Sequence, residues 1–310
     1  MSPGRYVAGP ITWYSFLILC GMLLAIFLGI REERRKGLPE GTVIDLALLI
    51  IPFGILGARL YYVLFTLENY LADPILILYI WEGGLAIYGG LIAGLAAALV
   101  YCRRKKLSLL KALDCLAPGV VLAQGIGRWG NFFNSEAYGL EITRPAWQFF
   151  PFGVLIDEGG TPVWHLATFF YESCWNLLVF ALLWGCRRRF RRDGDCFLWY
   201  TLLYACGRQF IEGLRLDSLY SFTGNLRVSQ ALAIAAAVAV LVWFFLRARR
   251  TGNVLIPALI WGSGLAAGLA FALLNSQSLI FCAFFWALTP MSALLLYRLT
   301  PRTEVENAHR

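Results

Sequence analysis

Charged side chains interrupt the long apolar stretches of this sequence. On insertion scales a charge at the centre of a membrane helix costs about 2.5–3.5 kcal/mol, so such residues are rare and commonly functional. The charged residues within or at the ends of apolar stretches are Arg59, Glu82, Arg128, Glu136, Glu172, Arg208, Glu212 and Arg215. Any single one can be structural, because Arg and Glu on neighbouring helices form ion pairs and residues near helix ends extend to the interface.

The arginines of this set favour one chemistry. A guanidinium group presents a planar fork of N–H donors that fits a phosphate group bidentately. A cluster of Arg59, Arg128, Arg208 and Arg215 near the outer leaflet therefore predicts an anionic phospholipid headgroup as the ligand.

One segment places polar side chains on a common face. In YACGRQFIEGLR, Tyr204, Arg208, Glu212 and Arg215 recur at i, i+4, i+8 and i+11, which is the repeat of one side of a helix. We expect this side to face the interior of a helix bundle. The alternative is an internal helix face held only by salt bridges.

The densest group of polar residues lies in GIGRWGNFFNSEAYG, residues 125–139. Three glycines flank Arg128 within six residues, so the backbone can approach a ligand closely and the helix can break there. Asn131, Asn134 and Glu136 add hydrogen-bond donors and acceptors. A motif for helix packing alone does not need an arginine and two asparagines.

This run closely resembles the signature of the prolipoprotein diacylglyceryl transferases, the membrane enzymes that begin bacterial lipoprotein maturation. The matching residues are Gly127, Arg128, Gly130, Asn131, Phe132, Asn134, Glu136 and Gly139. Further family-like segments are ITWYSF with Tyr14, GARLYYVLF, EGGLAIYGGLIAG, HLATFFYESCWN with Glu172, and GRQFIEGLRLDSL. The similarity extends from about residue 11 to residue 250.

The resemblance implies an enzyme that moves the diacylglyceryl group of phosphatidylglycerol to the lipobox cysteine of preprolipoproteins and forms a thioether. Such a reaction needs a thiolate and stabilisation of charge on the phosphate, which positioned guanidinium groups supply. The expected partners are phosphatidylglycerol and preprolipoprotein signal peptides. We expect no metal, no other cofactor and no nucleic acid.

The family resemblance and the polar pattern together give a set of candidate site residues. The catalytic candidates are Arg128, Arg208, Glu136 and Tyr88, and the substrate-binding candidates are Tyr14, Arg59, Asn131, Gly139, Tyr204, Glu212 and Arg215. We expect Arg128 and Arg208 to bind the phosphate, and Asn131 and Tyr14 to fix the headgroup. The glutamates are expected to orient the arginines or to take the thiol proton.

Tyr88 marks a departure from the family. The third-helix motif commonly has histidine before the paired glycines, a residue often proposed as the base, whereas this chain has AIYGG. An unperturbed tyrosine has a pKa of about 10, so it is a poor base near neutral pH, although its hydroxyl can donate a hydrogen bond. His165, one of only two histidines, lies where the outer cap returns to the fifth span and is expected to be structural.

The composition places all these residues in a membrane protein. Hydrophobic residues make up 59% of the 310 residues and charged residues only 15%, which excludes an ordinary cytosolic enzyme. The apolar segments that predict spanning helices are about 11–30, 43–67, 84–102, 109–133, 165–186, 195–213, 226–247, 253–274 and 279–299. The predicted fold is an all-α polytopic membrane protein.

Basic clusters predict the orientation of these helices. Residues 31–36, 103–106, 187–192 and 247–250 together hold 16 of the 27 Lys and Arg, although the net charge of +8 alone could suggest nucleic acid. The positive-inside rule places these clusters in the cytoplasm, the N-terminus outside and the C-terminus inside a bacterial cytoplasmic (inner) membrane. The first apolar stretch has its basic cluster after it, so we expect it to be retained.

The connections divide the chain into parts. Residues 134–164 are too polar to span and predict a small extracytoplasmic cap, and residues 215–227 are also expected outside. Residues 1–250 form the expected seven-helix transferase core. Residues 251–310 form an accessory two-helix hairpin with a short cytoplasmic tail. The eight cysteines contain no CxxC and are expected to be free thiols.

Two other functions remain as alternatives. A phospholipid or anion transporter, or a lipid-binding membrane protein, would also keep arginines within the membrane, but transporters often contain inverted repeats. The chain has no second copy of GRWGNFFN, which counts against a transporter. A purely structural membrane protein would explain the helices and glycines but not the arginine and asparagine cluster.

Overall fold

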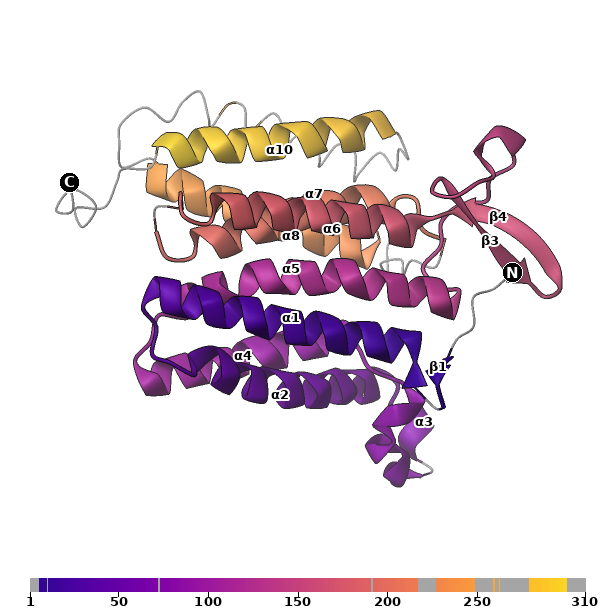
Figure 1. The fold of residues 1–310 in the computed structure, drawn as a ribbon, viewed down its shortest axis with the longest axis horizontal. Helices are drawn as coiled ribbons and strands as arrows, with labels where there is room; N and C mark the ends of the chain where they lie inside the picture. The colour runs from indigo at the N-terminus through magenta and orange to yellow at the C-terminus, as the bar shows by residue number, and fades with distance from the viewer. Residues whose placement is uncertain are drawn as a thin grey trace. The chain divides into compact units, whose positions relative to one another are not determined.

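The computed structural model describes residues 6–9, 11–71, 73–190, 192–216, 227–248, 259, 262 and 279–299. The helices are α1 (Trp13–Lys36), α2 (Thr42–Phe65), α3 (Glu68–Leu71), α4 (Ile87–Lys105), α5 (Leu109–Asn134), α6 (Thr168–Cys186), α7 (Asp195–Glu212), α8 (Val228–Ala248) and α10 (Leu279–Leu299) (Figure 1). The 3-10 helices are η1 (Pro74–Leu78), η2 (Ile80–Glu82) and η3 (Pro145–Trp147). The strands are β1 (Tyr6–Ala8), β2 (Ile11–Thr12), β3 (Gly153–Glu158) and β4 (Thr161–Leu166).

The long helices follow the apolar stretches. Helices α1, α2, α5, α6 and α8 are long and apolar enough to cross a membrane. Helix α7 carries Asp195, Arg208 and Glu212 within a similar length, so it is less apolar. The predicted all-α polytopic membrane protein is confirmed, with two short β-hairpins added. The predicted span 253–274 lies outside the described residues.

The chain forms two compact units. The smaller unit comprises residues 25–119, and the larger unit comprises residues 1–24 and 120–310. In the larger unit α10 packs against α7 and α8. This division into units does not test the predicted boundary at residue 250, which stays a prediction.

In the smaller unit small residues bring α2 and α4 into backbone contact. A Cβ atom on Gly57 would lie 2.7 Å from the carbonyl oxygen of Gly89, and one on Gly90 would lie 3.1 Å from that of Gly54. In lipid, helices associate by close packing and not by the hydrophobic effect, so small residues at the contact strengthen it. These contacts fix the distance between the two helix backbones at the first turn of α4.

In the larger unit glycines play the same part between α1 and α5. A Cβ atom on Gly130 would lie 2.6 Å from Cδ2 of Tyr14, and one on Gly127 would lie 3.0 Å from Ile18. Helix α5 runs unbroken to Asn134. The break that these glycines permit does not occur: in the membrane the backbone keeps its internal hydrogen bonds, and the glycines serve helix packing.

Helices α7, α8 and α10 lie side by side and share an apolar core (Figure 1). Leu202, Ala237, Phe244 and Leu296 are fully buried in it. Small side chains of α10, Ser292 and Ala293 among them, are also buried.

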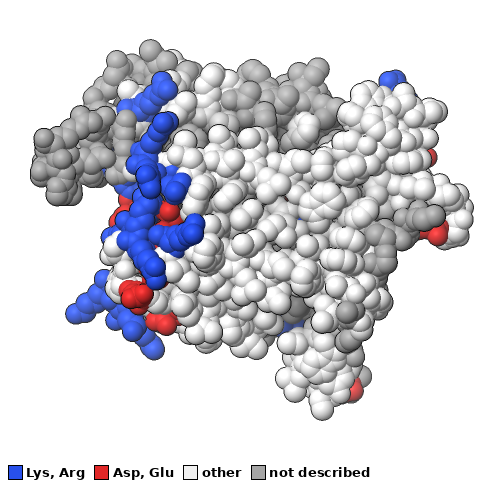
Figure 2. Space-filling model, in the orientation of Figure 1, with Lys and Arg blue, Asp and Glu red and all other residues white. Residues whose placement is uncertain are grey.

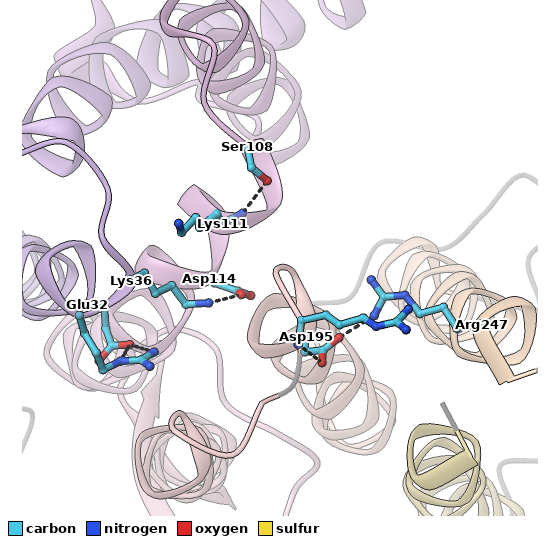
Figure 3. A network of polar contacts seen from close by, with 9 residues as sticks. Glu32, Lys36, Ser108, Lys111, Asp114, Asp195 and Arg247 are labelled. Carbon is cyan, nitrogen blue, oxygen red and sulfur yellow. Dashed lines mark hydrogen bonds and ion pairs between the residues drawn. The ribbon is translucent and has the colours of Figure 1, made fainter. Parts of the chain in front are cut away.

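On the face shown in Figure 2, basic side chains gather at one end of the helices, and the surface between the two ends carries few charges. In the smaller unit Lys36 pairs with the buried Asp114 at 2.6 Å. In the larger unit Arg247 pairs with the buried Asp195 at 2.6 Å (Figure 3). The first pair links the end of α1 to α5, and the second links the end of α8 to the start of α7. The seven cysteines among the described residues are free.

The predicted cap contains a β-hairpin. Strands β3 and β4 pair antiparallel from Gly153 with Leu166 to Glu158 with Thr161, and the hairpin projects beyond the end of α6 (Figure 1). The fifth span was predicted to begin at residue 165, but α6 begins at Thr168 because His165 and Leu166 complete β4.

Candidate active site

Two arginines of the larger unit share one carboxylate. Arg128 of α5 lies with Nη2 2.6 Å from Oε1 of Glu172, which comes from α6. Arg208 of α7 lies with Nη1 3.2 Å from Oε2 of the same glutamate. Nη2 of Arg208 also lies 2.7 Å from Glu212, one turn further along α7. Three helices therefore meet at one cluster of two guanidinium groups and two carboxylates.

Burial differs between the two kinds of charge. The side chains of Glu172 and Glu212 are each 4% exposed, whereas those of Arg128 and Arg208 are 21% and 17% exposed. The carboxylates therefore act from inside the protein and hold the forks in place. Preorganised cationic donors of this kind stabilise an anion that forms or binds beside them. A phosphate group is the anion that such forks fit.

Local packing explains how the three helices come so close. The hydroxyl of Ser173 donates to the carbonyl of Gly125 at 2.8 Å, which links α6 to α5 next to Glu172. The indole of Trp175 donates to Leu203 at 3.0 Å, which links α6 to α7. A Cβ atom on Gly207 would collide with this indole, so glycine beside Arg208 is required by the close approach.

A second polar group lies at the end of α5. Oε1 of Glu136 accepts hydrogen bonds from the side-chain amides of Asn131 at 3.2 Å and Asn134 at 3.0 Å. Ser135 and Ala137 have φ angles of 53° and 58°, so the chain turns sharply on both sides of Glu136. This turn returns the carboxylate to the helix end. Glu136 is exposed, so it is accessible to a substrate.

The two candidate tyrosines of the larger unit lie on different helices. Tyr14 lies in the first turn of α1, is 37% exposed and packs against Gly130. Tyr204 is half-buried on α7, one turn before Arg208, with its ring centroid 5.9 Å from that of Tyr200.

The predicted helix face on α7 is shorter than expected. Tyr204, Arg208 and Glu212 lie on α7, which ends at Glu212. The placement of Arg215 on the same helix face is wrong, because Gly213 and Leu214 form a turn and Arg215 pairs through its backbone with Gly139. Of the connection predicted at residues 215–227, residues 217–226 lie outside the described residues.

Gly139 lies in a closely packed backbone junction. Its N–H donates to Leu166 at 2.9 Å, and its carbonyl oxygen lies 3.0 Å from Nδ1 of His165. A Cβ atom there would lie 2.7 Å from the carbonyl oxygen of Leu214. These contacts give Gly139 a packing role, and its predicted substrate contact stays a prediction. His165 is buried beside Tyr138, and its expected structural role stays a prediction.

Arg59 lies in the smaller unit, on α2, and its guanidinium faces backbone. It donates to Leu76 at 2.6 Å, Ile77 at 2.9 Å, Gly83 at 2.9 Å and Gly84 at 3.1 Å. Arg59 is buried. Tyr88, in the first turn of α4, is half-buried in the same unit.

Glu172 is the residue that the candidate set lacks. It appears in the sequence as a charge in an apolar helix and in a family-like motif, but nothing in its spacing shows that it contacts two arginines. The useful signal was its charge type, because a carboxylate is the natural partner of an intramembrane arginine.

Comparisons with known proteins agree on one family. A family model described as prolipoprotein diacylglyceryl transferase matches residues 6–246. A phosphatidylglycerol–prolipoprotein diacylglyceryl transferase from Enterococcus faecalis is 45% identical over 244 residues, covering 77% of this chain and 87% of the relative. One from Streptococcus equi subsp. zooepidemicus is 42% identical over 258 residues, covering 81% of this chain and 97% of the relative. One from Limosilactobacillus reuteri is 41% identical over 263 residues, covering 80% of this chain and 91% of the relative.

Proposed function

Since the chain belongs to the prolipoprotein diacylglyceryl transferase family, as its motifs predicted, we propose that it transfers the diacylglyceryl group of phosphatidylglycerol to the lipobox cysteine of preprolipoproteins. A C–S bond forms between the cysteine sulfur and the primary carbon of the diacylglyceryl group. The C–O bond from that carbon to the phosphate breaks, and glycerol phosphate leaves. The thiol proton passes to a base, and the thioether product completes the first step of lipoprotein maturation.

The pair of guanidinium groups on Glu172 is the observation that carries the proposal. Arg128 and Arg208 come from different helices and are held by one carboxylate, so their donors are fixed before the lipid binds. Because negative charge moves onto the phosphate as the C–O bond breaks, donors fixed beside it lower the barrier. Glu212 fits the predicted orienting role through its ion pair with Arg208.

The remaining candidates supply the headgroup contacts and the base. Tyr14 and Asn131 are proposed to bind the glycerol headgroup, because one carries an exposed ring and hydroxyl and the other an amide at the end of α5. Tyr204 is proposed to line the same headgroup site from α7. Glu136 is the carboxylate proposed to take the thiol proton, and Tyr88 is proposed to supply a hydrogen bond.

The proposed location is the bacterial cytoplasmic membrane, with the N-terminus outside and the C-terminus inside. The clusters at residues 31–36, 103–106, 187–192 and 247–250 follow or end α1, α4, α6 and α8. Helices that alternate in direction bring these ends to one side, and that side is cytoplasmic by the positive-inside rule. Residues 251–310 are proposed as an accessory hairpin.

The test is transfer with purified components. The protein is mixed with phosphatidylglycerol labelled in its diacylglyceryl group and a lipobox peptide, and labelled peptide is measured. A peptide with serine in place of the lipobox cysteine is the substrate control. Arg104→Ala, at an exposed basic position, is the protein control and is expected to transfer normally. Absence of labelled cysteine peptide under conditions where a known relative transfers would contradict the proposal.

A further inference from the structure

We propose that Arg59 is a positioning residue for Tyr88, which it holds in place through the segment of residues 74–86. The inference rests on the proposed function, because it assumes that Tyr88 contributes to transfer. In this proposal Arg59 does not contact the phosphate directly. It acts on Tyr88 through the backbone of the segment that it binds.

The guanidinium of Arg59 joins two stretches of the segment. Nε and Nη2 donate to Ile77 and Leu76 in η1, and Nη1 donates to both Gly83 and Gly84. Hydrogen bonds from a charged donor are roughly twice as strong as those from a neutral donor. One side chain of α2 therefore fixes η1 and the turn before α4 together.

The turn is shaped to receive this side chain. Gly83 and Gly84 have φ angles of 96° and 67°, in the left-handed region that favours glycine. A Cβ atom on Gly84 would collide with Nη1 of Arg59. The guanidinium thus packs directly on the glycine backbone as well as bonding to its carbonyls.

The backbone on both sides of Tyr88 touches the same turn of α2. The N–H of Ala86 donates to the carbonyl of Ala58 at 3.0 Å. On the other side, Gly89 packs against the backbone of Gly57. Residues 57–59 therefore determine where α4 begins and where Tyr88 is placed, and Arg59 supplies the side-chain part of that contact.

The same contacts disfavour a phosphate ligand. Four of the five N–H groups of Arg59 donate to carbonyl oxygens. A bidentate grip on phosphate needs two parallel N–H groups, so binding phosphate would require breaking a carbonyl contact.

The first experiment compares Arg59→Lys and Gly84→Ala with Gly37→Ala. Lysine keeps the charge but has a single ammonium group, which cannot reach both stretches at once. Gly37 has a φ angle of 64°, close to that of Gly84, but a Cβ atom there meets nothing within 4 Å. We expect kcat to fall about 10- to 100-fold in the first two variants, with little change in the KM for phosphatidylglycerol, and to stay normal in Gly37→Ala.

The second measurement separates positioning from a general structural role. In a Tyr88→Phe background, Arg59→Lys should cause little further loss of kcat, because residues that act together are not additive. Independent losses that multiply would overturn the proposal, and so would a raised KM with unchanged kcat in Arg59→Lys.

A third measurement needs no transfer activity. Fluorotyrosine at position 88 should change its ¹⁹F chemical shift in Arg59→Lys and Gly84→Ala but not in Gly37→Ala, and the amide of Ala86 should exchange faster in the same two variants. An unchanged shift and unchanged exchange would overturn the proposal. If the protein fails to transfer at all, the proposed function fails, while these spectra still decide whether Arg59 positions Tyr88.

Discussion

Arg208 and Arg59 both lie in long helices, but their surroundings differ. Arg208 faces the carboxylates of Glu172 and Glu212 at 3.2 and 2.7 Å, and part of its side chain is exposed. Arg59 is buried and faces four backbone carbonyls at 2.6 to 3.1 Å. Tyr70 also places its ring 5.3 Å from the Arg59 guanidinium.

The type of acceptor separates the two uses of arginine. Carboxylates from other turns or helices fix a guanidinium and leave part of the fork accessible to a ligand. Backbone carbonyls make the guanidinium itself a structural element, because four of its five N–H groups donate to the loop. An intramembrane arginine therefore signals function only together with its acceptors.

The largest expected effect comes from removing either carboxylate-paired arginine. Arg128→Ala and Arg208→Ala should each lower transfer at least about 1,000-fold, because each removes a guanidinium that stabilises the departing phosphate. Lysine should restore little activity, since it lacks the planar fork. Transfer is measured with labelled phosphatidylglycerol, and membrane insertion is checked for each variant. Near-normal transfer in either Ala variant would contradict the assignment of that arginine to the phosphate.

Glu172→Gln tests whether one carboxylate orients both arginines. The change keeps the side-chain size but removes the charge that Arg128 and Arg208 share, so we expect kcat to fall about 100-fold. The KM for phosphatidylglycerol should not rise, because both cations remain. Glu212→Gln is the matched control and should cost less, since Glu172 lies beside both arginines whereas the ion pair of Glu212 is with Arg208. Equal losses in the two variants would contradict a shared orienting carboxylate.

The sequence predicted the helices well because lipid imposes a simple rule. A spanning segment must be long, apolar and internally hydrogen-bonded, so the apolar stretches correspond to α1, α2, α5, α6 and α8. The same rule explains why α5 does not break. The glycines around Arg128 look like a helix breaker, but Gly127 and Gly130 pack α1 onto an unbroken α5.

The partners of the arginines could not be read from the sequence. Arg59 and Arg128 give the same signal, an arginine in or at the end of an apolar stretch, and only the folded chain assigns carbonyls to one and Glu172 to the other. The 3.6-residue repeat also does not show that α7 ends at Glu212 and that Arg215 pairs through its backbone with Gly139. Long-range contacts decide these points.

Substitutions of Tyr88 test the part of the site that Arg59 is proposed to position. If Tyr88 supplies only a hydrogen bond, Tyr88→Phe should lower kcat about 10- to 100-fold and Tyr88→His should be tolerated. The pH profile of kcat distinguishes this from a role as sole base, which would make the Phe variant inactive and the native profile rise towards alkaline pH. A fully active Phe variant would remove Tyr88 from the mechanism.

The smallest effect on transfer is expected from deleting the C-terminal segment, which contains neither the arginines paired with carboxylates nor Arg59. Deleting residues 253–310 removes α10, whose only arginine, Arg298, lies in the last turn. In the larger unit α10 covers α7 and α8 through Ala293 and Leu296. Lipid tails can cover that face at little cost, because apolar surface is not exposed to water in a membrane.

We therefore expect the truncated protein to keep measurable transfer. A lost packing energy of about 1 kcal/mol would lower Tm by about 2–4 °C, which thermal unfolding in detergent measures. The deletion removes two predicted spans, so the C-terminus should stay on the same side, and labelling of a terminal cysteine checks this. Arg128, Glu172, Arg208 and Glu212 all precede the cut, so their ion pairs should survive. A well-inserted truncation without transfer would show that the hairpin completes the site, and that the distinction between paired and carbonyl-bound arginines does not by itself locate the active part of the chain.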